Sequence, residues 1–245
     1  MDVQDENGWT PLIWAARYSN FYFVSRVLNR DEPLCDVNYI DPNGWTAFEH
    51  AVAFFDSYTL KLIHRARSFN YNAVDSNGRT RLLRAIENCD VRMAAFLVEE
   101  EDCDPNIPDN NGRTPLTLAV SGWQAAHHSE NAMPVSRMQP NTTKPGSSDF
   151  TQQAALQMVE SEQERLVTLL LRNGADVNLQ DGSGRSALMI ASALGLFDIV
   201  DILLGVGGCD LNLVSHNGDT AHSLALGSGH MEVVRLLEED PFLPG

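Results

Sequence analysis

The stretch DGSGRSALMIASALGLFDIVDILLGVGGCDLN, residues 181–212, contains in one run a unit that recurs along the 245-residue chain. Gly184 stands where a tight turn needs a positive φ, and the Ser186 hydroxyl can accept a hydrogen bond from the free N–H groups that open a helix. Apolar residues follow at near-helical spacing until Gly195, and a second, more apolar run comes after it. The stretch therefore predicts a turn, two short helices and a loop.

The same unit occurs six times. In every copy a turn glycine is followed two residues later by Ser or Thr and seven residues later by alanine. The spacing between turn glycines is 34 or 36 residues, apart from one spacing of 72. The turn glycines are Gly8, Gly44, Gly78, Gly112, Gly184 and Gly218, and the alanines are Ala15, Ala51, Ala85, Ala119, Ala191 and Ala225. The alanines predict first helices packed too closely for a larger side chain, in a stack where each unit contacts only its neighbours.

These residues resemble the ankyrin repeat, whose pattern combines a glycine turn, Thr-Pro-Leu, paired alanines, Gly-His, an apolar helix and Gly-Ala-Asp-Val-Asn. Residues 8–16, 112–119, 166–178 and 225–237 match best, whereas Arg81 and His222 depart from the pattern. The resemblance implies an all-α solenoid of helix-turn-helix units joined by short β-turn or hairpin loops. It also implies one domain over residues 1–245, with repeats near 5–38, 41–72, 75–106, 109–178, 181–212 and 215–245.

The spacing of 72 residues predicts an insertion over residues 123–163, between the two helices of the fourth repeat. Its first part is rich in Ser, Gln, Asn, Pro and Met, which is typical of a flexible loop. From Asp149 onward, apolar residues at helical spacing predict an N-terminal extension of the outer helix that is recognisable from Leu166. Such an insertion has to project from the surface, where it can carry recognition.

Composition restricts the partners and the compartment. Lys and Arg total 17 against 33 Asp and Glu, and the net charge of −16 disfavours nucleic acid and anionic membrane surfaces. No apolar run approaches the roughly 20 residues of a membrane span. The four cysteines have no paired spacing, which predicts free thiols in a reducing, intracellular compartment, either cytoplasm or nucleus. We expect another protein or a peptide as partner, and a monomeric module.

Residues suited to catalysis or metal binding are sparse. His127 and His128 are adjacent in the predicted loop without a nearby cysteine, so a solvated loop explains them better than a metal site. No nucleophile constellation, phosphate-binding loop or dinucleotide motif is present, and the sequence predicts no enzyme, metal or cofactor. Asn178 closes a stretch that resembles the one an asparaginyl hydroxylase modifies in ankyrin repeats, which implies hydroxylation; the same residues are also the ordinary loop of the family.

The first repeat is unusually aromatic for the end of a solenoid, which normally has a polar outer face. Its aromatic residues are Trp9, Trp14, Tyr18, Phe21, Tyr22 and Phe23. Three interpretations stay open: the chain was cut from a longer protein, the aromatics contact a partner, or they fold into the first helix pair.

The main candidate site follows from the resemblance, because turn tips and inner helices line a concave face in this family and the residue after each turn glycine points into it. We call these the post-turn residues: Trp9, Trp45, Arg79, Arg113, Arg185 and Asp219. Trp and Arg are enriched at interface hot spots, and the aligned arginines predict a positive stripe on an acidic body. The alternative is that these are ordinary surface residues.

The sequence thus predicts a non-catalytic protein-interaction module, an adaptor or scaffold that binds a partner on the concave face and through the insertion. One alternative is an acidic chaperone that shields a basic client through its outer surface, where residues 99–102 and 238–240 are acidic. The other is a targeting domain of a larger enzyme.

Overall fold

The computed structural model describes residues 2–28, 35–53, 57–64, 66, 69–99, 103–128 and 162–239. The chain divides into two compact units, Met1–Asp75 and Ser76–Gly245. Within the described ranges the structure is helical without a sheet, and an isolated β-bridge pairs Gln180 with Ser186. The all-α solenoid is therefore confirmed, while the single domain expected from the period stays a prediction.

The first unit contains two helix pairs. They are α1 (Pro11–Arg17) with α2 (Phe21–Leu28), and α3 (Ala47–Ala53) with α4 (Ser57–His64). The inner helices α1 and α3 pack against each other, and so do the outer helices α2 and α4. Each pair thus stacks on the next through both of its helices.

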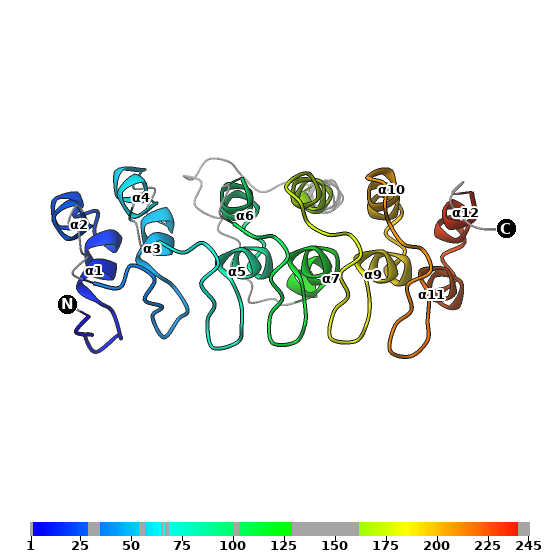
Figure 1. Ribbon diagram of the computed structural model, residues 1–245, viewed down its shortest axis with the longest axis horizontal. Coiled ribbons are helices and arrows are strands. Elements are labelled where there is room, and N and C mark those ends of the chain that lie inside the picture. The colour runs from blue at the N-terminus through cyan, green and yellow to red at the C-terminus, as the bar shows by residue number, and fades with distance from the viewer. Residues whose placement is uncertain are drawn as a thin grey trace, which may run out of the picture. The chain divides into compact units, whose positions relative to one another are not determined.

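The second unit continues the pattern with four helix pairs. Its inner helices are α5 (Arg81–Glu87), α7 (Pro115–His128), α9 (Ala187–Leu194) and α11 (Ala221–Ser228), and each packs against the next. Its outer helices are α6 (Val91–Val98), an unlabelled helix over residues 162–172, α10 (Phe197–Gly205) and α12 (Met231–Glu239). In this unit the hairpin loops lie on the side of the inner helices that faces away from the outer ones (Figure 1).

The predicted hydroxyl residues cap the inner helices. The side-chain oxygens of Thr10, Thr80, Ser186 and Thr220 each accept a hydrogen bond from the backbone N–H three residues later. These helices are seven or eight residues long, which is too short for stability in isolation. Packing must therefore hold them, and all six alanines of the predicted row are buried.

The turn glycines meet two requirements. All six have φ between 73° and 84°, as the sequence predicts. In the second unit the hairpin tips are also hydrogen-bonded to one another: the Gly182 N–H donates to Asn111 O and the His216 N–H to Ser183 O, both at 3.0 Å. A Cβ on Gly112 would lie 2.6 Å from the Gly182 nitrogen. Glycine is thus needed for the turn and for the close approach of the next hairpin.

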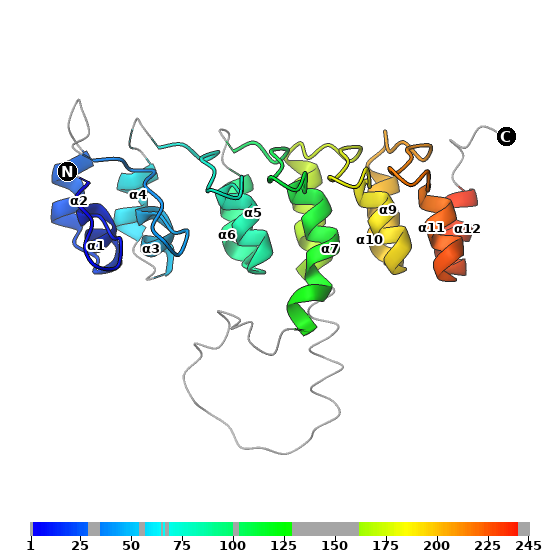
Figure 2. The same ribbon diagram turned by 90° about the horizontal axis from the view of Figure 1, so that it is seen from below.

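The boundaries of the predicted insertion need correction. Helix α7 continues to His128, well past the ends of α5 and α9 (Figure 2), so residues 123–128 are helical where a loop was expected, and His127 and His128 end a helix. The outer helix of this repeat is already formed at residue 162, and the buried Gln163 side chain donates to Ala119 O and Val120 O on α7. The rest of the insertion, including the extension expected from Asp149, lies outside the described residues.

Candidate protein-interaction surface

An acidic or hydroxyl residue three positions before the turn glycine fixes the backbone of the post-turn residues Trp9, Trp45, Arg113, Arg185 and Asp219. In the second hairpin, Asp41 Oδ1 accepts hydrogen bonds from the N–H groups of Asn43 at 2.9 Å and Trp45 at 2.8 Å. The same arrangement occurs at Asp5, Asp109, Asp181 and, through a hydroxyl, Ser215. Our sequence reasoning missed this clamp, although the recurrence of Asp or Ser at that position is visible in the sequence.

In the first unit, the two post-turn tryptophans pack against one histidine. The His50 ring lies 5.5 Å from Trp9 and 5.2 Å from Trp45, measured between centroids, and both indoles are half-buried. The Arg17 guanidinium lies 4.8 Å from the centroid of Trp9 and 3.4 Å from His50 Nδ1. Because arginine can only donate, Nδ1 must accept, and Nε2 then carries the proton toward Asp41 Oδ2 at 3.1 Å. This network holds both tryptophans in place.

In the second unit, a carboxylate bridges two of the post-turn arginines. Glu87, on α5, accepts from Arg79 Nη1 at 2.7 Å and from Arg113 Nη2 at 3.1 Å. Arg113 Nε also donates to Asp109 Oδ2 at 2.7 Å. Glu87 stands nine residues after its turn glycine, the same repeat position as Arg17 in the first repeat. Glu87 therefore orients the post-turn side chain of its own repeat and that of the next, whereas Arg17 contacts the post-turn Trp9 of its own repeat and His50 of the next.

Arg185 is held less tightly than the other two arginines. Its Nε and Nη2 donate to Asp181 Oδ2 at 3.1 and 2.9 Å. The positions equivalent to Glu87 in the fourth and fifth repeats are Ser121 and Ala193, which carry no carboxylate. Accordingly, the Arg185 side chain is 48% exposed, compared with 27% for Arg79 and 34% for Arg113.

The predicted positive stripe is therefore wrong in its charge. Arg79, Arg113 and Arg185 form ion pairs with Glu87, Asp109 and Asp181, which balance the three positive charges. The post-turn position by itself could not reveal this, because the carboxylates come from other positions of the repeat. Arg185 keeps donors for a partner, while the paired carboxylates offset the positive charges of the three arginines.

Asp109 lies deep in this network, with its side chain only 1% exposed. Burial opposes its ionisation, but hydrogen bonds from the Arg113 backbone and guanidinium and from the Asn111 N–H outweigh burial and lower the pKa of Asp109. A carboxylate with a depressed folded-state pKa stabilises the protein above its unfolded-state value of about 3.9. This stabilisation disappears as the pH falls through the folded-state pKa.

We therefore expect Asp109→Asn to lower the free energy of unfolding at pH 7 by about 1 to 2 kcal/mol, less than a fully buried charge pair because Arg113 is partly exposed. Below pH 4 the difference from wild type should shrink. Urea unfolding at several pH values measures this, with exposed Asp201→Asn as control. A difference that is independent of pH would show that the charge of Asp109 does not matter.

Asn178 connects two neighbouring loops. Its Oδ1 accepts from the Asp210 N–H and its Nδ2 donates to Gly208 O, both at 2.8 Å. Asn106 makes the equivalent bonds one repeat earlier. These bonds give both loop asparagines a structural role, and hydroxylation of Asn178 stays a prediction.

Cys35 and Cys89 are poorly suited to nucleophilic chemistry. All four cysteines are free thiols. Burial, with a smaller contribution from Asp2, raises the pKa of Cys35 to about 11, and burial next to Glu162 also raises the pKa of Cys89. A raised pKa leaves little of the reactive thiolate at neutral pH. Within the described ranges, no group of three His, Cys, Asp or Glu side chains is placed to hold a metal ion.

The fold and the repeated hairpins agree with the comparisons to known proteins. The family model described as ankyrin repeats (3 copies) matches residues 1–63, 48–130 and 154–242, so the chain belongs to the ankyrin repeat family. The crystal structure of the ankyrin repeat domain of Bcl-3, described as a unique member of the IkappaB protein family, superposes with a TM-score of 0.68 at 23% identity. The match covers 97% of this chain and 85% of that one, and it shows the fold alone.

Two curated plant proteins share a shorter segment. The chain is 40% identical over 80 residues to the E3 ubiquitin-protein ligase XBAT33 of Arabidopsis thaliana, and equally to the probable E3 ubiquitin-protein ligase XBOS33 of Oryza sativa subsp. japonica. The aligned segment spans 32% of this chain but only 15% of each relative. Ankyrin repeats bind other proteins and are typically non-catalytic modules. Across the described ranges, the helices are too short or too polar to cross a membrane.

Proposed function

We propose that the chain is a non-catalytic adaptor or scaffold whose post-turn residues bind another protein. The observation that carries this proposal is that both the backbone and the side chain of two post-turn residues are fixed by neighbouring groups. Trp45 and Arg113 each have a backbone N–H held by a hairpin aspartate and a side chain held by an inner-helix residue. Such preorganised Trp and Arg side chains lose little conformational entropy on binding, so more of their contact energy appears as affinity.

The ion pairs narrow the chemistry of the partner. Arg185, the most exposed of the three arginines, uses Nε and Nη2 for Asp181, so further N–H groups remain to meet a carboxylate or a backbone carbonyl. The half-buried indole of Trp45 offers an apolar contact in the first unit. These features suit a partner segment that combines acidic and apolar residues.

The test begins with the partner, captured from the source cell with the whole chain, identified by mass spectrometry and purified. We expect Trp45→Ala and Arg185→Ala each to weaken the Kd by about 2 kcal/mol, roughly 30-fold. Arg185→Lys should also weaken binding, because lysine cannot form forked bonds to a carboxylate. Arg113 is less suitable for this test, because its guanidinium also holds Asp109 and Glu87.

The matched control is Glu99→Ala, which removes an exposed carboxylate at the end of α6. It should change the affinity little. The opposite ranking, with loss at Glu99 and none at Trp45 or Arg185, would contradict the proposal. It would favour an acidic chaperone that binds a basic client through the outer surface.

A second candidate function, recruiting a substrate for ubiquitin transfer, is favoured by the 40% identity to two ubiquitin ligases. In that role the same post-turn residues hold the protein to be modified. Protein purified from the source cell, supplied with ubiquitin and the activating and conjugating enzymes, should then ubiquitylate the captured partner, and Arg185→Ala should reduce the transfer. Absence of ubiquitylated partner would exclude this role.

A further inference from the structure

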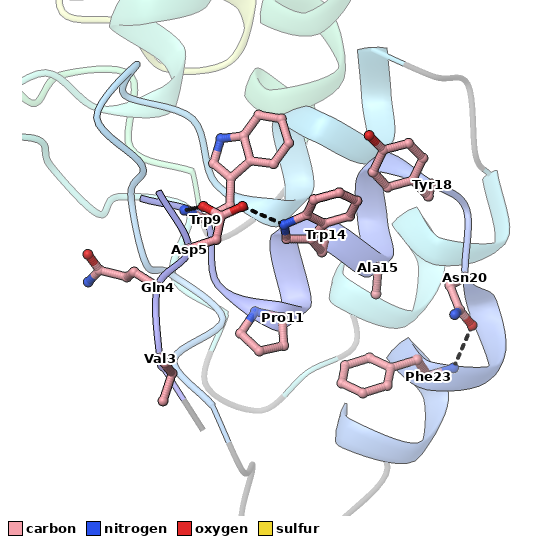
Figure 3. Close-up of a pocket in the computed structure, with 10 residues that line it drawn as sticks. All are labelled: Val3, Gln4, Asp5, Trp9, Pro11, Trp14, Ala15, Tyr18, Asn20 and Phe23. Atoms are coloured by element: carbon pink, nitrogen blue, oxygen red, sulfur yellow. Dashed lines mark hydrogen bonds between the residues drawn. The ribbon is translucent and has the colours of Figure 1, made fainter. Parts of the chain in front are cut away.

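A groove of about 640 Å³ lies along the side of α1 (Figure 3). Its walls are mostly apolar and come from α1 itself, from the extended segment before it and from α2. The main contributors are Val3, Pro11, Trp14, Ala15, Tyr18 and Phe23. The volume is within the range of about 300 to 1,000 Å³ that is typical of ligand sites.

The exposed aromatic residues in this groove are held rigidly. Trp14 and Tyr18 are stacked, with centroids 4.6 Å apart and planes at 23°. The Trp14 indole N–H donates to Asp5 Oδ2 at 2.7 Å, which fixes the ring. Even so, Trp14 is 42% exposed and Tyr18 is 60% exposed. Exposed aromatics that are already ordered lose little entropy when a partner covers them.

The other repeats indicate what this face of an inner helix accommodates. Ala47, His50 and Ala51 occupy the repeat positions of Pro11, Trp14 and Ala15, and all three are buried. The helix α1 packs against α3, and Trp9 and Arg17 of the first repeat lie against His50. In the second repeat, the equivalent face of α3 is therefore covered by the first repeat. The first repeat places the Arg17 guanidinium beside His50, the residue equivalent to Trp14.

We propose that the groove docks an amphipathic helix of a partner protein, with apolar residues in the groove and an arginine or lysine against Trp14 and Tyr18. A cation over an aromatic face gains cation–π energy, and the Asp5 carboxylate lies beside it. Exposed Asp2 and Glu6 flank Asp5 and add charge complementarity for a basic helix. A net charge of −16 disfavours a second copy of this chain.

This second surface rests on the protein-binding function proposed above. The post-turn residue Trp9 also lines the groove, but Trp14 and Tyr18, on which the test depends, are not post-turn residues. A test that varies both surfaces separates the two proposals. If Arg185→Ala does not weaken binding of the natural partner, the proposal for the groove is unaffected. If the peptide test at the groove fails, the proposal for the post-turn residues is unaffected.

The probe is a phage library of random 16-residue peptides, selected on the whole chain and counter-selected on Trp14→Ala. We expect enrichment of sequences with apolar residues at helical spacing flanked by Lys or Arg. A synthetic peptide of this kind should gain helicity on binding, seen by circular dichroism, and bind more weakly at high salt. Fluorescence anisotropy should show at least tenfold weaker binding to Trp14→Ala and Tyr18→Ala, and less than a twofold change for Arg185→Ala.

Thermal melts check that the variants fold. If Trp14→Ala does not fold, Tyr18→Ala replaces it in the test. Enrichment of proline-rich or acidic sequences, or of none, would overturn the proposal. Full binding to Tyr18→Ala would do the same. Sedimentation velocity provides a last check: a dimer that Tyr18→Ala dissociates would identify the groove as a contact between two copies, in place of a partner helix.

Discussion

Gly112→Ala is expected to reduce the free energy of unfolding by about 2 to 3 kcal/mol. The φ of +74° costs an L-residue about 1 to 2 kcal/mol. The new Cβ would also lie 2.6 Å from the Gly182 nitrogen and so disturb the hydrogen bond from Gly182 N–H to Asn111 O, worth about 0.5 to 1.5 kcal/mol. Urea unfolding followed by circular dichroism gives the difference.

Gly218→Ala is the matched control for this prediction. Its φ is +84°, but no heavy atom lies within 4 Å of the added Cβ. The control should therefore show only the conformational cost, about 1 to 2 kcal/mol. Equal losses in the two variants would mean that the contact between successive hairpins contributes nothing to stability.

Ala191→Leu is expected to destabilise the protein by about 1 to 3 kcal/mol through overpacking. Ala191 is fully buried on α9, which packs against both α7 and α11, so extra methylene groups have to push the inner helices apart. Ala193→Leu is the control, because Ala193 lies two residues further along the same helix and is only half-buried. Differential scanning calorimetry should show a lower Tm for Ala191→Leu, and unchanged melting would contradict the predicted helix contacts.

The features that the sequence reveals are those required by local backbone geometry or close packing in every repeat. The φ of Gly184, the cap at Ser186 and the burial of Ala191 follow this rule, and all three are confirmed. The end of α7 does not follow it. The Ser, Gln, Asn, Pro and Met content from residue 123 onward suggested a loop, yet Ala125 and Ala126 are strong helix formers and the helix continues to His128.

The candidate site is less predictable because it depends on contacts between repeats. The positions of the post-turn residues follow from the turn glycines, but their ion pairs depend on Glu87, which reaches Arg79 in its own repeat and Arg113 in the next. A reading of one repeat position at a time could not find that bridge. An alignment of the six copies by repeat position places Glu87 and Arg17 at the same position, so the sequence does contain a signal that charged residues occur there.

The aromatic first repeat shows a similar limit. Folding into the first helix pair is the wrong interpretation for Trp14, Tyr18, Phe21 and Tyr22, which are each at least 42% exposed. Their number was evident in the sequence. Their exposure depends on which face of α1 and α2 a neighbouring helix covers, and composition does not contain that information.

The most direct test of the central claim is amide hydrogen exchange of the whole chain with and without its captured partner. The account predicts slower exchange in residues 41–46, 109–114 and 181–186, which contain the hairpin turns and the post-turn residues. Exchange in the outer helices α6 and α10 should stay unchanged. Slower exchange confined to α6, α10 and α12, with none in the hairpins, would contradict the account.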